Sequence, residues 1–405
     1  MTAGIHWPQA RALMAALVFV PAAGQAASWQ DWQFNGFGTL GGVYHHEDGL
    51  EYRRDVTQPH GAQSGKLDLS VDSSLGGQLS GPLTDKLSAT LQLVSKLNDS
   101  NNWSPRPTWA FLKYQFEGDS SVRVGRLLLD LQMRSDSNGI GYANTPIRPA
   151  LEMYGNIRPE VYDGVDVTLV RPLGQGLGRV KLMAGDLYGD LTLAPGTVLD
   201  MRHKPFVSAY VEYQQGAWTG RFSARHLAMG DATGAAELRD VLRQAGAADA
   251  AAVLDSANQT INFYGLGVAY DEGNLQGSAQ YSVWGYNTRL GGPYTHSLLL
   301  ESSYRLGDLQ PYAAASWAWS KRDYVATGLA ADNPLNQVAL AVQQGFFSNQ
   351  FSFTLGSRYE LTPQLAVKAQ VDYLDVKDPI VLLETTPSSS RRRFNVYSLS
   401  LDFVF

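Results

Sequence analysis

The densest group of residues that could do chemistry lies in one polar segment, from Asp130 to Glu160. The segment mixes carboxylate and guanidinium groups with two tyrosines, three glycines and three prolines. Its charged residues are Asp130, Arg134, Asp136, Arg148, Glu152, Arg158 and Glu160. Opposite charges on facing walls of a narrow, water-filled space create a transverse field that orients dipolar solutes. The segment therefore predicts a charged constriction, provided that neighbouring elements hold it inside the protein.

The elements that must position this segment are predicted to be β-strands. The clearest one is the stretch from Tyr397 to Phe405, where residues of odd number are aromatic or aliphatic and Ser398, Ser400 and Asp402 form the opposite face. The same alternation runs through 66–80, 275–283 and 365–373. One face of such a strand suits lipid and the other suits water, over about the nine residues that a tilted strand needs to cross a bilayer.

The connections between these strands alternate between short and long. Seven are turn-like stretches rich in Gly, Pro, Asn and Asp, at 81–85, 117–120, 174–178, 214–217, 271–274, 307–308 and 361–364. Eight are longer polar segments, near 45–65, 98–107, 130–160, 190–203, 229–260, 288–296, 325–349 and 377–391. This pattern predicts an all-β transmembrane antiparallel barrel of about sixteen strands over 28–405, with a lumen too wide for side chains to fill.

The amino-terminal residues and the composition agree with export to a membrane. Residues 1–27 carry Arg11, an apolar run from Ala12 to Val20 and a small-residue stretch, which predicts a signal peptide cut after Ala26 or Ala27. The chain has no cysteine and a net charge of −6, so we expect no disulfide framework, no thiolate metal site and no nucleic-acid partner. After the signal, no apolar run is long enough for a membrane-spanning helix.

Two segments carry a resemblance to a known family. Thr108-Trp-Ala-Phe-Leu-Lys-Tyr-Gln-Phe116, followed by Ser121-Val-Arg-Val-Gly-Arg126, resembles the Gram-negative general porins, especially the Neisseria/Comamonas-like branch. The terminal Phe405 resembles the aromatic that the barrel-assembly machinery reads in such barrels, although the Gly-x-x-His-x-Phe ending of many members of that branch is missing. The resemblance implies an outer-membrane channel in which the third loop folds inward and narrows the pore, and it implies that Arg126 faces the acids of this loop.

Strand parity leaves two alternatives for this arginine. A regular strand puts Val122, Val124 and Arg126 on one face and Arg123 with Gly125 on the other. Either a bulge at Gly125 turns Arg126 into the lumen, or Arg123 is the residue that faces the pore. We favour the first alternative. The constriction set is then Arg126, Arg123, Asp130, Asp136, Arg148, Glu152 and Glu160. The other lumenal cations predicted from parity are expected mainly to keep the lumen wet: Lys113, Lys181, Arg221, Arg225, Arg305, Arg358 and Lys368.

The remaining motifs indicate loops rather than chemistry. His45 and His46 have no metal-ligand spacing and are expected in a solvated first loop. Arg391-Arg-Arg393 would lie at the extracellular rim, exposed or near lipopolysaccharide phosphates. The stretch from Ala235 to Ala252 has the apolar spacing of a short helix inside the fifth loop. No catalytic constellation is recognisable, so we expect no enzyme, no cofactor and no metal.

The sequence as a whole indicates a passive water-filled channel, which we expect to be a homotrimer in the outer membrane of a Gram-negative bacterium. Its expected partners are small hydrophilic solutes and ions, outer-membrane lipid and lipopolysaccharide, and the barrel-assembly machinery. The first alternative is a substrate-selective channel of the same fold, for an organic anion or an oligosaccharide. The second is a structural or receptor barrel with a plugged lumen.

Overall fold

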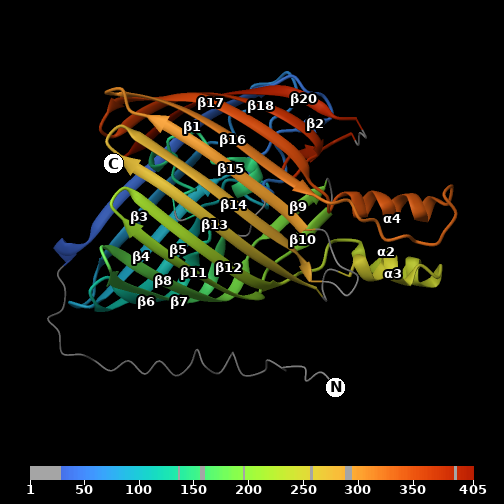
Figure 1. The fold of residues 1–405 in the computed structure, drawn as a ribbon, viewed down its shortest axis with the longest axis horizontal. Helices are drawn as coiled ribbons and strands as arrows, with labels where there is room; N and C mark the ends of the chain where they lie inside the picture. Colours follow the sequence, from blue (N-terminus) through green and yellow to red (C-terminus); the bar gives the residue numbers. More distant parts are fainter. Residues whose placement is uncertain are drawn as a thin grey trace.

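The computed structural model describes residues 29–135, 137–155, 160–194, 197–255, 259–287, 294–386 and 390–405. Within these residues, antiparallel strands pair around one closed barrel (Figure 1). The strands, in chain order, are β1 (Gln33–His45), β3 (Ser74–Pro82), β4 (Leu87–Lys96), β5 (Arg106–Glu117), β6 (Ser120–Leu128), β7 (Val161–Leu173), β8 (Gly176–Tyr188), β11 (Lys204–Gln215), β12 (Trp218–Ala228), β13 (Thr260–Glu272), β14 (Leu275–Asn287), β15 (Tyr294–Tyr304), β16 (Leu309–Ser320), β17 (Asn349–Thr362), β18 (Leu365–Asp378) and β20 (Arg392–Val404). The predicted barrel of about sixteen strands is confirmed. The predicted signal peptide lies outside the described residues.

The barrel closes where β20 pairs with β1. Leu401 lies opposite Leu40, and the ladder continues to the end of the chain, where the amide of Gly36 donates to the carbonyl of Phe405 at 2.8 Å. The Phe405 ring fills the space that a side chain at position 36 would need, since a Cβ on Gly36 would lie 2.1 Å from the ring. The terminal aromatic is therefore part of the closing seam.

Short turns and long loops leave opposite ends of the barrel, which we call the turn end and the loop end. The seven turns are residues 83–86, 118–119, 174–175, 216–217, 273–274, 305–308 and 363–364. The eight long connections, L1 to L8, are residues 46–73, 97–105, 129–160, 189–203, 229–259, 288–293, 321–348 and 379–391. L6 lies outside the described residues. The predicted alternation of short and long connections is confirmed. Each tight turn contains the Gly, Pro, Asn or Asp that such a turn requires.

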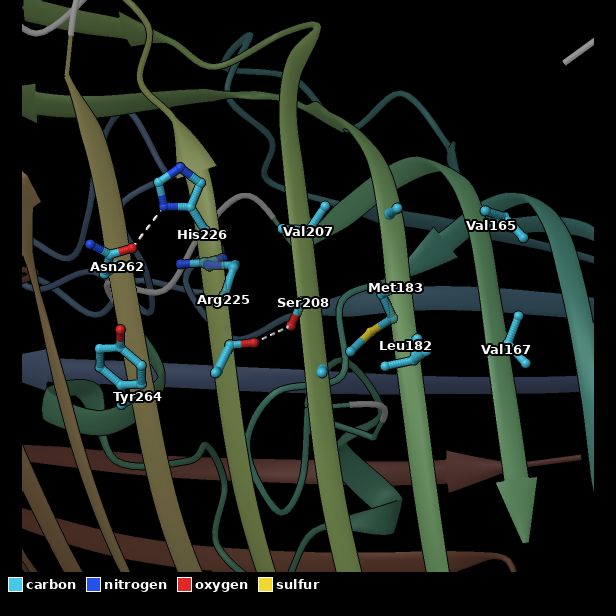
Figure 2. A pocket seen from close by; sticks show the side chains of 13 residues that line it. Val165, Val167, Leu182, Met183, Val207, Ser208, Arg225, His226, Asn262 and Tyr264 are labelled. Atoms are coloured by element: carbon cyan, nitrogen blue, oxygen red, sulfur yellow. Dashed lines mark hydrogen bonds between the residues drawn. The ribbon is translucent and has the colours of Figure 1, made fainter. Parts of the chain in front are cut away.

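The two faces of the wall differ as the alternation predicts. On β18, Val367, Val371 and Tyr373 are exposed outward, whereas Lys368 and Asp372 point inward and are buried. Figure 2 shows the outer surface over β7 to β13, where a shallow groove of about 500 Å³ is lined by side chains such as Leu182, Val207 and Tyr264. Among the described residues no helix is long and apolar enough to span a membrane.

Several small elements lie in the segments outside the barrel wall. They are η1 (Trp29–Asp31), β2 (Leu50–Glu51), η2 (Gly141–Ala143), η3 (Leu151–Gly155, a π-helix), β9 (Asp190–Ala194), β10 (Thr197–Asp200), α2 (Ala235–Gln244), α3 (Ala248–Val253), α4 (Pro334–Gln344) and β19 (Leu383–Glu384). The helix predicted in L5 is confirmed, although the predicted stretch from Ala235 to Ala252 forms two helices, α2 and α3. Leu242 of α2, Ala250 of α3 and Ala339 of α4 are fully buried in one small core, so L5 and L7 form a lobe at the loop end (Figure 1).

Candidate functional site: the third loop and the lumenal wall

L3 runs through the interior of the barrel, and those of its charged residues that the structure describes bind the wall rather than face one another. Arg148 shows this most clearly, because only 2 % of its side chain is exposed. Its guanidinium pairs with Asp72 at the end of L1 and with Asp372 on β18, at 3.1 Å for the second pair. It also donates to the hydroxyl of Tyr52 at 2.8 Å. Burial disfavours its charge, but the two carboxylates outweigh this effect and raise the pKa of Arg148 above its usual value.

Glu152 anchors the next part of the loop. It lies in η3 and is completely buried, and its carboxylate accepts hydrogen bonds from the Gln350 amide at 2.6 Å and from the Ser352 hydroxyl at 2.8 Å, both on β17. Burial raises the pKa of the Glu152 carboxyl. Because Glu152 is buried and its partners Gln350 and Ser352 are neutral hydrogen-bond donors, it holds η3 against the wall and does not face an open space.

A lysine of the wall holds the middle of the loop through its backbone. Lys368 of β18 donates to the carbonyl oxygens of Gly141 and Asn144 at 2.8 and 2.7 Å, and its ammonium lies 3.0 Å from a carboxylate oxygen of Asp402. A Cβ at Gly141 would lie 2.2 Å from Asp402 and 2.3 Å from Thr39. Only glycine allows the loop to come this close to β1 and β20.

Asp130 anchors the beginning of the loop. Its carboxylate lies 3.1 Å from the Lys181 ammonium of β8 and 2.7 Å from the guanidinium of Arg221 on β12. Burial opposes the charge of this carboxylate, but the two cations prevail and hold the pKa of Asp130 below its ordinary value. Asp130 therefore neutralises two wall cations and ties L3 to β8 and β12.

The two arginines of β6 are not arranged as we expected. The pairing of β6 with β5 and with β7 continues through Gly125 without a shift in register, so no bulge turns the strand there. Arg126 lies on the outward face with Val124, pairs with Asp163 at 2.7 Å and stacks 4.1 Å from the Tyr188 ring. The expectation that Arg126 faces the third loop is wrong, because the strand keeps its regular period.

Arg123 is the arginine of β6 that faces the lumen. Its Nε donates to Asp166 of β7 at 3.0 Å, and 18 % of its side chain is exposed. Glu160, at the end of L3, is also partly exposed at 20 %; it accepts from Asn138 at 2.9 Å and lies 3.8 Å from the Lys96 ammonium. Asp136 lies outside the described residues. Of the described candidates, Arg123 and Glu160 keep charged surface toward the lumen, while Asp130, Arg148 and Glu152 are buried anchors.

L1 also enters the interior, which the sequence did not suggest. Arg53 is 1 % exposed and donates to the carbonyls of Val381 in L8 and of Thr192 in L4, at 2.8 and 3.1 Å. The adjacent Arg54 donates to the carbonyl of Asn138 in L3 at 2.6 Å. L1 therefore binds L3, L4 and L8 together at the loop end. The paired arginines of Tyr52-Arg-Arg-Asp55 in a polar loop were the only sequence signal.

Two further expectations can be compared with the structure. His45 is fully buried at the end of β1, where its Nε2 lies 2.7 Å from the carbonyl oxygen of Ala62, rather than in a solvated loop. Arg391 and Arg393 both pair with Asp375 at the loop end of β18. Among the described residues, no group of three His, Asp or Glu side chains could hold a metal ion.

No model of a known protein family and no curated protein matches this chain. Solved structures are similar in fold. The anion-selective porin from Comamonas acidovorans is 12 % identical with a TM-score of 0.57, over 92 % of this chain and 99 % of that chain. OmpF of Salmonella typhi, solved in complex with daunomycin, is 11 % identical with a TM-score of 0.56, over 93 % and 99 %. The trimer form of OmpT, an outer-membrane protein of Vibrio cholerae, is 11 % identical with a TM-score of 0.51, over 92 % and 99 %. The chain therefore has the fold of the porins.

Proposed function

We propose that this protein is a porin-type channel in the outer membrane of a Gram-negative bacterium, through which small hydrophilic solutes and ions diffuse down their gradients. The observation that carries the proposal is the closed barrel with an apolar outer face and a charged, polar inner face, crossed by a loop that is pinned to the wall at Asp130, Lys368, Arg148 and Glu152. A wall of this kind suits lipid outside and water inside. A loop that is fixed to the wall narrows the pore but does not swing across the pore and close it.

The proposal also covers the export of the protein, the assembly of the barrel and its oligomeric state. Residues 1–27 direct export, and Phe405 is read by the barrel-assembly machinery. Three barrels associate, in line with the trimer form of the Vibrio cholerae protein. Arg391 and Arg393 share one carboxylate, Asp375, so the loop end of β20 carries a surplus positive charge that suits lipopolysaccharide phosphates. We assign the protein no catalytic activity.

The interlocked loops favour a second candidate, a channel selective for one class of solute. L1, L3, L4 and L8 meet around Arg53 and Arg54, and the apolar residues of these loops join wall residues such as Phe206 and Phe263 in one buried cluster. This cluster fills part of the lumen at the loop end. A channel narrowed in this way passes solutes that match its lining and slows others.

Single-channel recording in planar bilayers tests the proposal and separates the two candidates. A general porin gives large ohmic steps in KCl, and its conductance rises in proportion to salt concentration. A selective channel gives small steps that saturate and that one class of solute blocks. Absence of any current from protein with barrel circular dichroism would contradict both candidates and favour a plugged structural or receptor barrel.

A further inference from the structure

A cavity lies inside the barrel, between L3 and the inner face of β13 to β16. Its volume is about 260 Å³, and Met133 and Thr145 of L3 line one side of it. On the opposite side, three small inward-facing residues lie in one row across the ladder: Ala269 of β13, Ser278 of β14 and Ala314 of β16. Because larger side chains would fill this space, the hollow is a consequence of the residue types at these three positions.

Glu301 of β15 completes this row and keeps one carboxylate oxygen available to a solute. Its Oε1 accepts from the guanidinium of Arg134 and from the hydroxyl of Ser278, both at 2.5 Å. In the part of the chain that the structure describes, no residue donates to its Oε2. The side chain is 11 % exposed and lines the cavity, so this second oxygen can accept a hydrogen bond from a solute.

Asp271 brings a second carboxylate to the cavity, at the end of β13 that lies nearest the turn end. It is exposed, and its Oδ2 accepts from the Gln276 amide at 2.8 Å. Among the described residues that line the cavity, Arg134 is positive while Asp271 and Glu301 are negative, which gives a net charge of −1. Because Arg134 pairs with Glu301, the charge of Asp271 is the one left over. Arg305, in the turn after β15, is exposed and does not line the cavity.

The wall beside Asp271 consists of groups that both donate and accept hydrogen bonds. Gln276 of β14 and Ser303 of β15 follow Asp271 in one row of the ladder, and both line the cavity. Gln310 of β16 donates to Oε1 of Gln276 at 2.8 Å and to the Ser303 hydroxyl at 3.0 Å. The hydroxyls of a solute can exchange hydrogen bonds with such amides and hydroxyls, whereas an apolar solute would cover them without satisfying them. The lining therefore favours a hydroxylated solute.

We propose that this cavity binds a small organic monocation that carries several hydroxyl groups. The ammonium group of the solute binds Asp271, a hydroxyl donates to Oε2 of Glu301, and the carbon skeleton lies in the hollow over Ala269 and Ala314. A net charge of −1 calls for a single positive charge and disfavours anions. This inference rests on the proposed function in one respect, since the lumen is the path by which the solute arrives.

Equilibrium dialysis with the full-length barrel in detergent, at about pH 6, tests the site without requiring conduction, because amines and carboxylates are both charged there. The probes are glucosamine, glucose, glucuronate and cyclohexylammonium, which separate the effect of charge from that of hydroxyl groups. We expect glucosamine to bind most tightly. Asp271→Asn should weaken glucosamine binding at least about fivefold, the worth of one ion pair at 4 Å in water, and should leave glucose binding unchanged.

Two further variants complete the design. Glu272→Gln is the matched control, because Glu272 is the next residue of β13 but lies on the outer face, where it accepts from the Tyr270 hydroxyl at 2.9 Å. It should bind glucosamine as the wild type does. Ala269→Leu fills the hollow and should weaken the binding of glucosamine and glucose alike. In the wild type, added salt should weaken glucosamine binding more than glucose binding, which tests the charge even if Asp271→Asn does not fold.

Unchanged glucosamine binding by Asp271→Asn would overturn the proposal, and so would glucuronate or cyclohexylammonium binding as tightly as glucosamine. Bilayer recording separates this inference from the proposed function. Current steps from a barrel that does not prefer glucosamine would contradict the site alone. Glucosamine binding by a barrel that carries no current would contradict the channel and leave the site.

Discussion

Arg123 and Asp166 face each other across the β6–β7 ladder on its lumenal side, with Nε and Oδ1 3.0 Å apart, while Arg126 and Asp163, three residues further along each strand, form the equivalent pair on the outer side. Both pairs join an arginine of β6 to an aspartate of β7, and they occupy opposite faces of the wall. They therefore provide a matched test of which charges the permeating ions meet.

Arg123→Ala should raise the preference of the channel for cations. The substitution removes a lumenal positive charge and leaves Asp166 with Lys181, 3.7 Å away, as its remaining ion-pair partner. The permeability ratio should change by no more than about fivefold, since a unit charge at 4 Å in water is worth about 1 kcal/mol. Reversal potentials in a KCl gradient measure the change. Arg126→Ala should leave them unaltered, and the opposite pattern would mean that β6 has the bulge that the structure lacks.

Arg148→Met should release the middle of L3 from the wall. It leaves the carboxylates of Asp72 and Asp372 buried without their cation, and breaking one partner of a buried pair costs about 3–5 kcal/mol. The barrel should stay heat-modifiable on gels, while trypsin should cleave L3 faster and open-channel noise should increase. Arg134→Met is the control, because Arg134 forms one ion pair within the described residues, with Glu301, and 29 % of its side chain is exposed. Equal cleavage of both variants would show that Arg148 is not a principal anchor.

Glu152→Gln should change the pH dependence of stability. Burial raises the pKa of Glu152 above 4.5 in the folded protein, so the folded state holds this proton more tightly than the unfolded chain does. Its contribution to stability is therefore present at low pH and is lost as the pH rises through the raised pKa. The variant should gain stability relative to the wild type between pH 4 and pH 7, measured as the temperature of the gel-mobility shift. The exposed Glu237 supplies the control, Glu237→Gln. If the difference in transition temperature between the wild type and Glu152→Gln stays constant across this pH range, the raised pKa of Glu152 is refuted.

Phe405→Ala should impair assembly of the barrel. The ring packs over Gly36 with its centre 6.2 Å from the Phe34 ring, so the substitution opens the seam between β1 and β20. The yield of heat-modifiable protein in outer membranes should fall severalfold. Leu399→Ala, an exposed residue on the outer face of the same strand, is the control. Equal yields for the two variants would count against a special role for the terminal aromatic.

The barrel could be predicted from the sequence because its determinants are local. Period-two alternation marks each strand, and Gly, Pro, Asn and Asp mark each turn, so the strand order followed once the connections were placed. α4 was missed although its signals were present: Asn333 caps the helix by accepting from the amide of Leu335, and Pro334 occupies its first turn. The polar residues near 325–349 predict only a long loop there.

The candidate site was less predictable because the residues that pair with its charged side chains are distant in the sequence. Asp72 and Asp372 give Arg148 its role, and they lie 76 and 224 residues away from it. No local pattern shows that a charged loop residue will be buried against such partners instead of lining an opening. At Arg126, the resemblance outweighed strand parity in our prediction, and parity alone would have given the correct face.

The most direct test of the account is the single-channel conductance of the purified, heat-modifiable protein in planar bilayers, recorded for the wild type beside Arg123→Ala. A water-filled lumen lined by the inward face of the strands predicts discrete current steps in KCl and a cation-directed shift of the reversal potential in the variant. Silent bilayers, or steps whose selectivity ignores Arg123, would contradict the claim that solutes pass through this barrel along that wall.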